Sequence, residues 1–315
     1  MIERVPSSKG VAAAAKRISG MVTRTPLLPL DLGGRRFRVK AECLQQGGSF
    51  KLRGASNRLA QLSAAERARG VVAFSSGNHA QGVALAAQRL GIAAAIVMPS
   101  DAPAVKVEGT SAAGAEIVFY DRATGSREAI GAKLAAERGA TLVPSFDDVD
   151  VIEGQGTVGV EIAEQLGSAP PMVIVPCGGG GLSGGIALAL PDSEIVAVEP
   201  EGWDDMTRSL ARGRIVPVEE PAPPTLCDAL QTKLVSPLTF GALQGAGARG
   251  LSVTEAEVEE AMRFAFRTLR IVAEPGGAVA LAALLSGKVE APDGAVLVVS
   301  GGNVDPALYA RILGR

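Results

Sequence analysis

Short apolar, β-branched runs alternate with alanine-rich helical stretches along nearly all of the 315 residues. Continuous apolar runs are typical of strands buried on both faces, and a helix after each strand is the connection that a parallel sheet requires. The expected strands are VVAF (71–74), AAAIVMP (93–99), EIVFY (116–120), ATLVP (140–144), MVIVP (172–176), EIVAVEP (194–200) and AVLVVS (295–300). The expected helices cover 79–90, 102–113, 126–138, 151–166, 181–190, 254–269 and 275–286. The pattern therefore predicts an α/β protein whose parallel sheets carry helices on both faces.

The expected strands fall into two groups. Four of them lie between 71 and 144, and the long helix over 151–166 separates them from the later strands. We therefore expect two open lobes, a small α/β domain at 67–144 inserted into a large domain formed by 1–66 and 145–315. In open α/β folds, ligands bind beyond the carboxyl ends of the strands, so the cleft between the lobes is the expected site.

Charge and hydropathy exclude several function classes. Lys and Arg number 31 against 33 Asp and Glu, and no basic stripe is present, so a nucleic-acid or anionic-membrane partner is not expected. Although 47% of the residues are hydrophobic, no apolar run approaches the roughly 20 residues that span a bilayer. The first 20 residues, with Glu3 and lysines on both sides of a short alanine stretch, do not form a secretory signal. We expect a soluble, cytoplasmic protein.

Histidine and cysteine are scarce. His79 is the single histidine, which rules out a zinc site built from several imidazoles. Cys43, Cys177 and Cys227 are widely spaced and form no CxxC pair. Neither a disulfide framework nor a thiolate metal site is therefore expected.

Glycine, by contrast, is abundant, with 39 residues. Gly178 to Gly181 directly follow the strand at 172–176 and precede a helix pattern that starts near Leu182. Residues without Cβ allow backbone N–H groups to converge on an anion, and the helix N-terminus adds a favourable dipole. The turn is thus predicted to bind phosphate. Taken alone, Gly179, Gly181 and Gly184 also satisfy the GxGxxG fingerprint, with Glu199 as an acidic ribose partner, so an NAD-binding protein is an alternative.

Two further segments carry chemistry. In GGSFKLRGA, Lys51 starts a helix pattern among small and apolar neighbours, which suits a lysine of lowered pKa for Schiff-base chemistry or, alternatively, an exposed first-turn residue. In FSSGNHAQG, the residues Ser75 to His79 follow a strand and open a helix. That position suits either anion binding or ordinary helix capping.

Five motifs in this order and spacing resemble the serine/threonine dehydratase and serine racemase family, the tryptophan synthase β-like (fold type II) enzymes that use pyridoxal phosphate. The motifs are SFKLRGA, SSGNHAQG, the GGGG turn, EPGGA (274–278) and VVSGGN (298–303). The resemblance spans about 20 to 310 and places the cofactor in the cleft between two lobes. It leaves no length for the regulatory domain of biosynthetic threonine dehydratases, and it favours pyridoxal phosphate over NAD.

The resemblance implies cofactor-binding residues. Lys51 would hold the cofactor covalently, Phe50 would pack beside its ring, and Asn78 would donate to the ring oxygen. Ser300 would face the pyridine nitrogen. Since a hydroxyl, unlike a carboxylate, does not hold that nitrogen protonated, loss of a β-substituent would compete well with transamination. The remaining implied cofactor contacts are Gly178, Gly179, Gly180, Gly181, Leu182 and Glu274.

The same resemblance implies substrate and metal ligands. Ser75, Ser76, Gly77, Asn78 and His79 would surround the substrate carboxylate, which Arg127 would also contact. Lys51 would remove the α-proton, and Ser76 would serve as the acid or base on the opposite ring face, as in the racemases. In VEPEGWDD, Glu199, the Trp203 carbonyl and Asp205 would hold Mg²⁺ or Ca²⁺, which prefer oxygen ligands; the alternative is a solvated acidic loop.

The reaction predicted is β-elimination from a β-hydroxy amino acid, giving a 2-keto acid and ammonia, with L-threonine and L-serine as the main candidates. Amino acid racemisation, and dehydration of 3-hydroxyaspartate or phenylserine, are the alternatives. They stay open because CDALQT (227–232) stands where many members resemble ADGIAV, so that Ala229 replaces a glycine near the substrate. LQQGGSFK also departs from the usual residues before GSFK. The resemblance further implies a homodimer.

Overall fold

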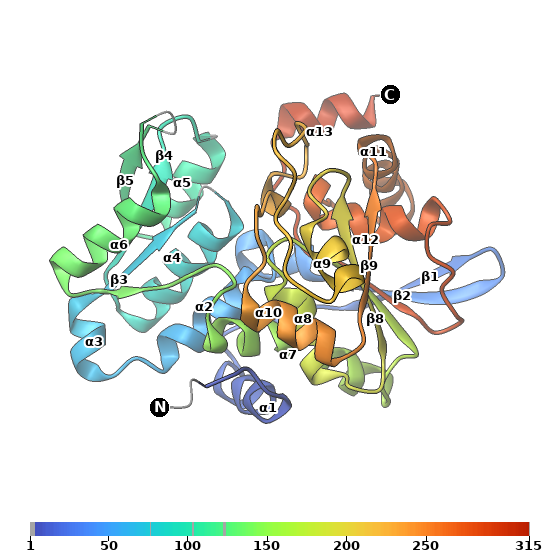
Figure 1. The fold of residues 1–315 in the computed structure, drawn as a ribbon, viewed down its shortest axis with the longest axis horizontal. Helices are drawn as coiled ribbons and strands as arrows, with labels where there is room; N and C mark the ends of the chain where they lie inside the picture. Colours follow the sequence, from blue (N-terminus) through green and yellow to red (C-terminus); the bar gives the residue numbers. More distant parts are fainter. Residues whose placement is uncertain (1–3, 76, 103, 122–123, 315) are drawn as a thin grey trace.

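The computed structural model describes residues 4–75, 77–102, 104–121 and 124–314 and shows two sheets side by side (Figure 1). The six-stranded sheet has the order β1-β2-β10-β7-β8-β9, and the four-stranded sheet has the order β5-β4-β3-β6. All neighbouring strands are parallel except β1, which pairs with β2 antiparallel. The predicted α/β class with two parallel-rich sheets is confirmed. The domain boundaries at 66/67 and 144/145 stay a prediction.

The bounds of the strands are β1 (Leu27–Leu32), β2 (Arg35–Ala41), β3 (Val71–Phe74), β4 (Ala94–Pro99), β5 (Glu116–Tyr120), β6 (Thr141–Leu142), β7 (Met172–Pro176), β8 (Glu194–Pro200), β9 (Arg249–Val253) and β10 (Val296–Val299). The helices are α1 (Ser8–Arg17), η1 (Glu42–Leu44), η2 (Gln46–Gly48), α2 (Lys51–Ala60), α3 (Ala64–Arg69), α4 (Asn78–Leu90), α5 (Ala104–Ala112), α6 (Arg127–Arg138), α7 (Val149–Leu166), α8 (Gly181–Ala189), α9 (Asp205–Arg212), η3 (Asp228–Leu230), α10 (Pro237–Gly245), α11 (Glu255–Phe264), the π-helical turn η4 (Ala265–Leu269), α12 (Pro275–Leu285) and α13 (Pro306–Leu313).

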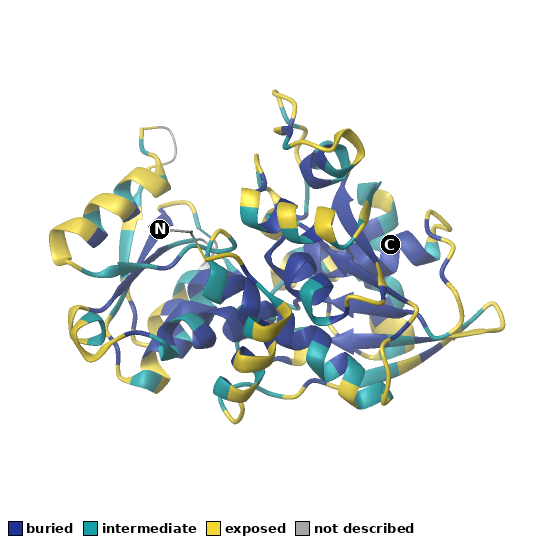
Figure 2. Ribbon diagram, turned by 60° about the horizontal axis from the view of Figure 1, so that its bottom comes forward, coloured by how far each residue is buried: buried dark blue, intermediate teal, exposed yellow. Residues whose placement is uncertain are grey.

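Both faces of each sheet are covered, as the continuous apolar strands predicted. In β7, Ile174 packs into one core with α11 and α12, whereas Val173 and Val175 pack into a second core with α7 and α8. In the four-stranded sheet, one face packs against α2 and α4, and the other packs against α6. Figure 2 shows the resulting buried interior of the strands and the exposed outer helix faces. No helix among the described residues is long and apolar enough to cross a membrane.

Three strands were missed by the sequence reasoning. The hairpin β1–β2 turns at Gly33 and Gly34, both with positive φ, and β2 alternates exposed arginines with buried Phe37 and Val39. Alternation is typical of a strand with one solvated face, and a search for continuous apolar runs overlooks it. The third, β9, is mostly half-exposed at the opposite edge of the sheet. The strand expected at 140–144 is only the two-residue β6, also at an edge.

Helix α7 packs against two other helices through bare backbone. A Cβ built on Gly156 would lie 2.6 Å from the carbonyl oxygen of Gly185 in α8, and one built on Gly154 would lie 2.6 Å from Cα of Gly54 in α2. Since such distances are too short for any side chain, these glycines allow three helices to approach at backbone contact. Part of the glycine excess therefore serves helix packing, which the sequence analysis had not anticipated.

A cluster of buried charged side chains connects α2, α7 and the end of β2. Arg53, in α2, donates to both carboxylate oxygens of Glu42 and of Glu161, at 2.7 to 2.9 Å, and its side chain is fully buried. Lys40, also fully buried, donates to Glu161 at 2.6 Å and to the carbonyl of Thr25 at 2.8 Å. Two cations thus meet two anions, so that each buried charge has the partners that burial requires.

We expect Gly185→Ala to destabilise the fold by about 2–4 kcal/mol, because the new methyl group would lie 2.5 Å from the backbone nitrogen of Gly156. Denaturant unfolding measures the change. Gly241→Ala is the matched control: it lies inside α10, where a Cβ meets nothing within 4 Å, and it should leave stability unchanged or raise it by up to about 1 kcal/mol. Equal stabilities of the two variants would contradict the close packing of α7 and α8.

Candidate active site

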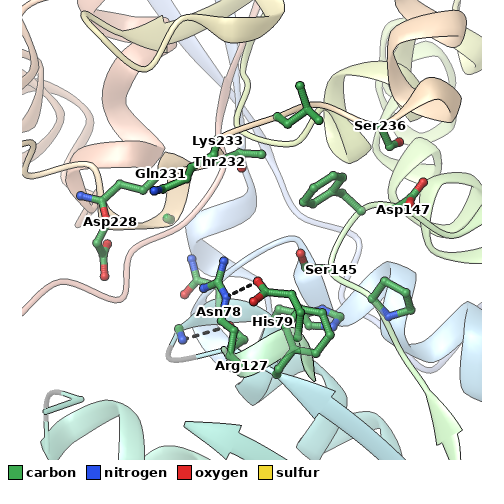
Figure 3. A pocket seen from close by; sticks show the side chains of 18 of the residues that line it. Asn78, His79, Arg127, Ser145, Asp147, Asp228, Gln231, Thr232, Lys233 and Ser236 are labelled. Carbon is green, nitrogen blue, oxygen red and sulfur yellow. Dashed lines mark hydrogen bonds and ion pairs between the residues drawn. The ribbon is translucent and has the colours of Figure 1, made fainter. Parts of the chain in front are cut away.

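A pocket of about 1020 Å³ lies where the carboxyl ends of the two sheets face each other. Residues of the four-stranded sheet, such as Phe74 and Ser75, line one side, and the segment 228–237 lines the other. Figure 3 shows this arrangement, with Asn78, His79 and Arg127 across the pocket from Asp228, Gln231, Thr232 and Lys233. The pocket therefore occupies the cleft in which the sequence analysis expected the site.

Lys51, the first residue of α2, projects into this pocket. Its Nζ donates to the carbonyl oxygen of Ser145 at 2.9 Å and lies 5.2 Å from the centre of the Phe50 ring. Burial lowers the pKa of Lys51 to about 8, although the nearby carboxylate of Glu274 partly opposes the shift. Such an amine is unprotonated far more often at neutral pH than an ordinary lysine, and is therefore a nucleophile or base.

The loop 300–303 brings two of the predicted motifs to Lys51. Phe50 N–H donates to the Ser300 carbonyl at 3.2 Å, and Ser49 forms a β-bridge with Gly301. Glu274 N–H donates to the Gly301 carbonyl at 3.0 Å. Three segments more than 200 residues apart at their extremes, SFKLRGA, EPGGA and VVSGGN, thus meet beside one amine, and Ser300 is buried among them.

Asn78 begins α4 and connects this group to the second motif. Its Nδ2 donates to Glu274 Oε1 at 2.5 Å, and its Oδ1 accepts from Asn303 Nδ2 at 2.8 Å. Asn303 also donates to the Gly47 carbonyl at 2.8 Å and so holds three loops together. The sequence reasoning placed no role on Asn303, although it lies within the VVSGGN segment.

Glu274 is a fully enclosed carboxyl group. Its Oε2 has no hydrogen-bond partner in the described chain. Burial and the neighbouring charge of Asp228 raise the pKa of Glu274 to about 7, although the hydrogen bond from Asn78 opposes the rise. A buried oxygen that lacks a partner beside Lys51 and Asn78 marks a position where a polar group of a ligand would complete the hydrogen bonds.

The glycine turn offers free donors to an anion. Within the described chain, the backbone N–H groups of four residues donate to no acceptor: Gly178, Gly179, Gly181 and Leu182. Gly180 has φ +83°, which favours glycine, and a Cβ on Gly179 would lie 2.3 Å from the Phe146 ring. These four N–H groups, next to the start of α8, are donors that an anion could accept from, and the phosphate-binding role of the turn stays a prediction.

The segment 75–79 has mixed roles. Gly77 N–H donates to Ser75 Oγ at 3.1 Å, and Ser76 lies outside the described residues. His79 is buried, and its Nε2 is 2.8 Å from the Val143 carbonyl, while Nδ1 has no partner in the described chain. Burial and the neighbouring Lys51 lower the pKa of His79 to about 3, so that the imidazole is neutral. His79 therefore supplies no positive charge for a carboxylate.

Two cationic side chains besides Lys51 lie on the side of the pocket that the four-stranded sheet and its helices form. Arg127, at the start of α6, lines the pocket, has a 43% exposed side chain and donates to Glu128 at 2.8 Å. Lys106, in α5, is paired with Asp228 of η3 across the pocket. The sequence analysis missed Lys106 because a single lysine in a helix gives no local signal.

The predicted cation ligands lie behind the glycine turn. Glu199 is fully buried and accepts from the backbone of Met206 and Thr207 at 3.1 and 2.7 Å. Asp205 is buried, and neither of its carboxylate oxygens accepts a hydrogen bond in the described chain. Burial raises the pKa of Asp205 to about 7, and burial together with Asp205 raises the pKa of Glu199. Enclosed in this way, Glu199 is not accessible to a ribose, which removes the support for the NAD alternative.

The remaining predicted residues are placed as follows. Leu182 is buried at the first turn of α8. Trp203 lines the pocket, and its indole N–H donates to the Pro223 carbonyl at 2.8 Å. No group of three or more His, Cys, Asp or Glu side chains suited to a metal occurs in the described part of the chain. A site at Glu199 and Asp205 would therefore depend on the Trp203 carbonyl and water.

The lowered pKa of Lys51 makes a direct prediction. In the cofactor-free protein, the rate at which an amine-acylating reagent modifies Lys51 should rise with pH and level off near pH 9, because the amine loses its proton around pH 8. Peptide mass spectrometry measures the rate, and the exposed Lys133 is the internal reference for the reagent. A Lys51 rate that still rises steeply between pH 9 and 10.5 would contradict the assigned environment.

Comparisons with known proteins agree with this geometry. Residues 18–301 match the model of the family described as "Pyridoxal-phosphate dependent enzyme". An L-threo-3-hydroxyaspartate ammonia-lyase from Pseudomonas sp is 44% identical over 98% of this chain and 99% of that protein. A protein of the same name from Saccharomyces cerevisiae is 41% identical over 98% of this chain and 97% of that one. The structure of maize serine racemase superposes with a TM-score of 0.92 at 36% identity, covering 98% and 97% of the two chains.

The family match, the fold and the lysine-containing pocket agree: this chain belongs to the pyridoxal-phosphate-dependent enzymes of fold type II, in the group that contains the hydroxyaspartate and threonine ammonia-lyases and the serine racemases.

Proposed function

We propose that this protein is an ammonia-lyase that converts L-threo-3-hydroxyaspartate into oxaloacetate and ammonia. The observation that carries the choice of substrate is the similarity of 44% and 41%, over essentially full length, to two proteins with that named activity. It favours the acidic alternative over L-threonine and L-serine, which were the main candidates from the sequence. The net reaction balances, since the β-hydroxyl leaves as water and one water enters as the amino group departs as ammonia.

The residues around Lys51 fit the cofactor of the family. Lys51 offers an amine for covalent attachment, and the free N–H groups of the glycine turn offer donors to a phosphate. Asn78, Glu274 and Ser300 would surround the ring, with Phe50 beside it. When bound, pyridoxal phosphate supplies an electron-withdrawing ring that stabilises negative charge at the substrate α-carbon.

Lys51 is the proposed base. Its lowered pKa allows the free amine to accept the α-proton near neutral pH, and its side chain faces the pocket. The neutral hydroxyl of Ser300 provides no charge at the ring nitrogen, which limits accumulation of negative charge at the α-carbon and favours loss of the β-hydroxyl.

The substrate α-carboxylate is proposed to bind at the segment 75–79, where α4 begins. The helix N-terminus presents N–H groups and a positive dipole end, and Gly77 leaves the approach to them open. The neutral His79 would act there as a spacer rather than as a charge. Arg127, which lines the same pocket, is the proposed further contact of the carboxylate.

Steady-state kinetics on L-threo-3-hydroxyaspartate, L-threonine and L-serine test the proposal. We expect kcat/KM for the hydroxyaspartate to exceed the other two by at least about tenfold, an advantage of about 1.4 kcal/mol in transition-state binding. Lys51→Ala should lose turnover of all three. Retained turnover in that variant would refute the assigned base, and a preference for L-threonine or L-serine would restore the original candidates.

Racemisation is the second candidate function, because the maize serine racemase structure covers 98% of this chain. Ser76 is the proposed acid or base on the ring face opposite Lys51. Chiral analysis of L-serine incubated with the enzyme tests this role: D-serine should form in the wild type and be lost in Ser76→Ala. Absence of D-serine in the wild type would exclude the racemase function.

We also propose a divalent cation at Glu199, Asp205 and the Trp203 carbonyl. Two adjacent buried carboxyl groups of raised pKa, with Asp205 lacking hydrogen bonds, fit a site that a hard cation would complete. Since binding to the folded state stabilises it, millimolar Mg²⁺ or Ca²⁺ should raise the Tm and a chelator should lower it.

Glu199→Gln should abolish that Tm response, whereas Asp204→Asn, which removes a neighbouring carboxylate outside the proposed set, should retain it. A Tm that responds to neither the cations nor the chelator would show that the acidic pair is only structural. The homodimer and the cytoplasmic location stay predictions, and size-exclusion chromatography with light scattering tests the former.

A further inference from the structure

A dicarboxylic substrate needs a second cation in the pocket, and this inference therefore rests on the proposed function. Among the described residues that line the pocket, the cations are Lys51, Lys106, Arg127 and Lys233. Lys51 is committed to the cofactor, and the segment 75–79 with Arg127 is the proposed α-carboxylate site. Lys233 has a 71% exposed side chain that pairs with Glu220. Lys106 is the remaining cation.

Lys106 lies beside the proposed substrate-binding loop. Its side chain is only 9% exposed, yet the residue lines the pocket. A methyl group built on Gly77 would lie 3.8 Å from Lys106 Nζ, which puts the ammonium next to the segment that receives the α-carboxylate. Lys106 also acts electrostatically on Glu274, the buried carboxyl group that accepts a hydrogen bond from Asn78.

The present partner of Lys106 can be replaced. Asp228, which accepts from Lys106, has a 51% exposed side chain, in contrast to the buried ammonium. A carboxylate of the substrate that took its place would restore the charge pairing of the buried lysine, and Asp228 would return to water at low cost. An amino acid without a side-chain carboxylate has no group to make this exchange.

We propose that Lys106 is a specificity-determining residue, whose ammonium exchanges Asp228 for the β-carboxylate of a dicarboxylic amino acid. The bridge between the two sides of the pocket then serves as a preformed carboxylate site, in which Asp228 occupies the position of the missing substrate group. The pair selects for four-carbon diacids because Lys106 lies next to the loop that holds the other carboxylate.

Binding of L-aspartate and L-alanine to the holoenzyme isolates this contact. Neither amino acid carries a β-hydroxyl to lose, and they differ by the one carboxylate. Dissociation constants can be measured from the cofactor absorbance and from competitive inhibition. Wild type should bind L-aspartate more tightly, and Lys106→Gln should weaken L-aspartate binding by about ten- to a hundredfold, with L-alanine changed less than about threefold.

Asp228→Asn distinguishes a carboxylate site from a structural bridge. Removing the competing carboxylate should leave L-aspartate binding unchanged or tighter, whereas a bridge that merely holds the two sides together would be broken equally by either substitution. Lys133→Gln, which removes an exposed charge of α6 outside the pocket, is the control for net charge and should change neither constant. Thermal melts of each variant establish that it is folded.

Equal weakening of L-aspartate binding by Lys106→Gln and Asp228→Asn would overturn the proposal, as would equal loss of L-aspartate and L-alanine in Lys106→Gln. Selective loss of L-aspartate binding in Arg127→Gln, with binding unchanged in Lys106→Gln, would overturn the proposal and assign the role to Arg127.

The failure of this inference can be told apart from the failure of the proposed reaction. If L-aspartate binds through Lys106 but 3-hydroxyaspartate is not turned over, the proposed reaction fails and this inference stands. If 3-hydroxyaspartate is turned over equally by wild type and Lys106→Gln, the inference alone fails.

Discussion

The backbone contact of α7 with α2 and α8 is the constraint on which the site depends. Helix α2 starts at Lys51, and α8 starts at the glycine turn. Because Gly154 and Gly156 carry no side chains, both helices rest directly on α7, and the distance between amine and turn is set by backbone rather than by adaptable side chains. A cofactor held at one end by a lysine and at the other by a phosphate turn needs such a fixed separation.

The charged side chains around Arg53 fix the orientation of α2 within this packing. The guanidinium lies two residues after Lys51 and binds Glu161 of α7 and Glu42, which follows β2. Hydrophobic contacts alone would tolerate rotation of α2 about its axis, whereas paired hydrogen bonds to two carboxylates do not. Burying four charges contributes little net stability, but it fixes one orientation of the helix that carries the reactive amine.

The electrostatics of the pocket follow from shared burial. Burial lowers the pKa of Lys51 and of His79 and raises that of Glu274, so that in each of the three it favours the neutral form. The proposed base Lys51 therefore has a lowered pKa, and His79 is neutral. The neighbours of Lys51 in GGSFK suggested Schiff-base chemistry, and the family resemblance implied its role as base, but the neutrality of His79 depends on burial and on the nearby Lys51 charge, which no local motif encodes.

Local pattern was sufficient for the α/β class and for most strands and helices, because apolar periodicity and turn chemistry act over a few residues. The five motifs together pointed to one site only through their resemblance to a known family. Local pattern failed at β1, β2 and β9, where exposed and half-exposed residues interrupt the apolar run. Asn303, Ser145 and Lys106 escaped for a different reason: each acts on a partner distant in the chain. The sequence by itself determined which residue types are available for the chemistry; only the tertiary structure decided which of them meet, since burial and pKa arise from contacts between segments far apart in the chain, and the pairing of Lys106 with Asp228 joins residues 122 positions apart.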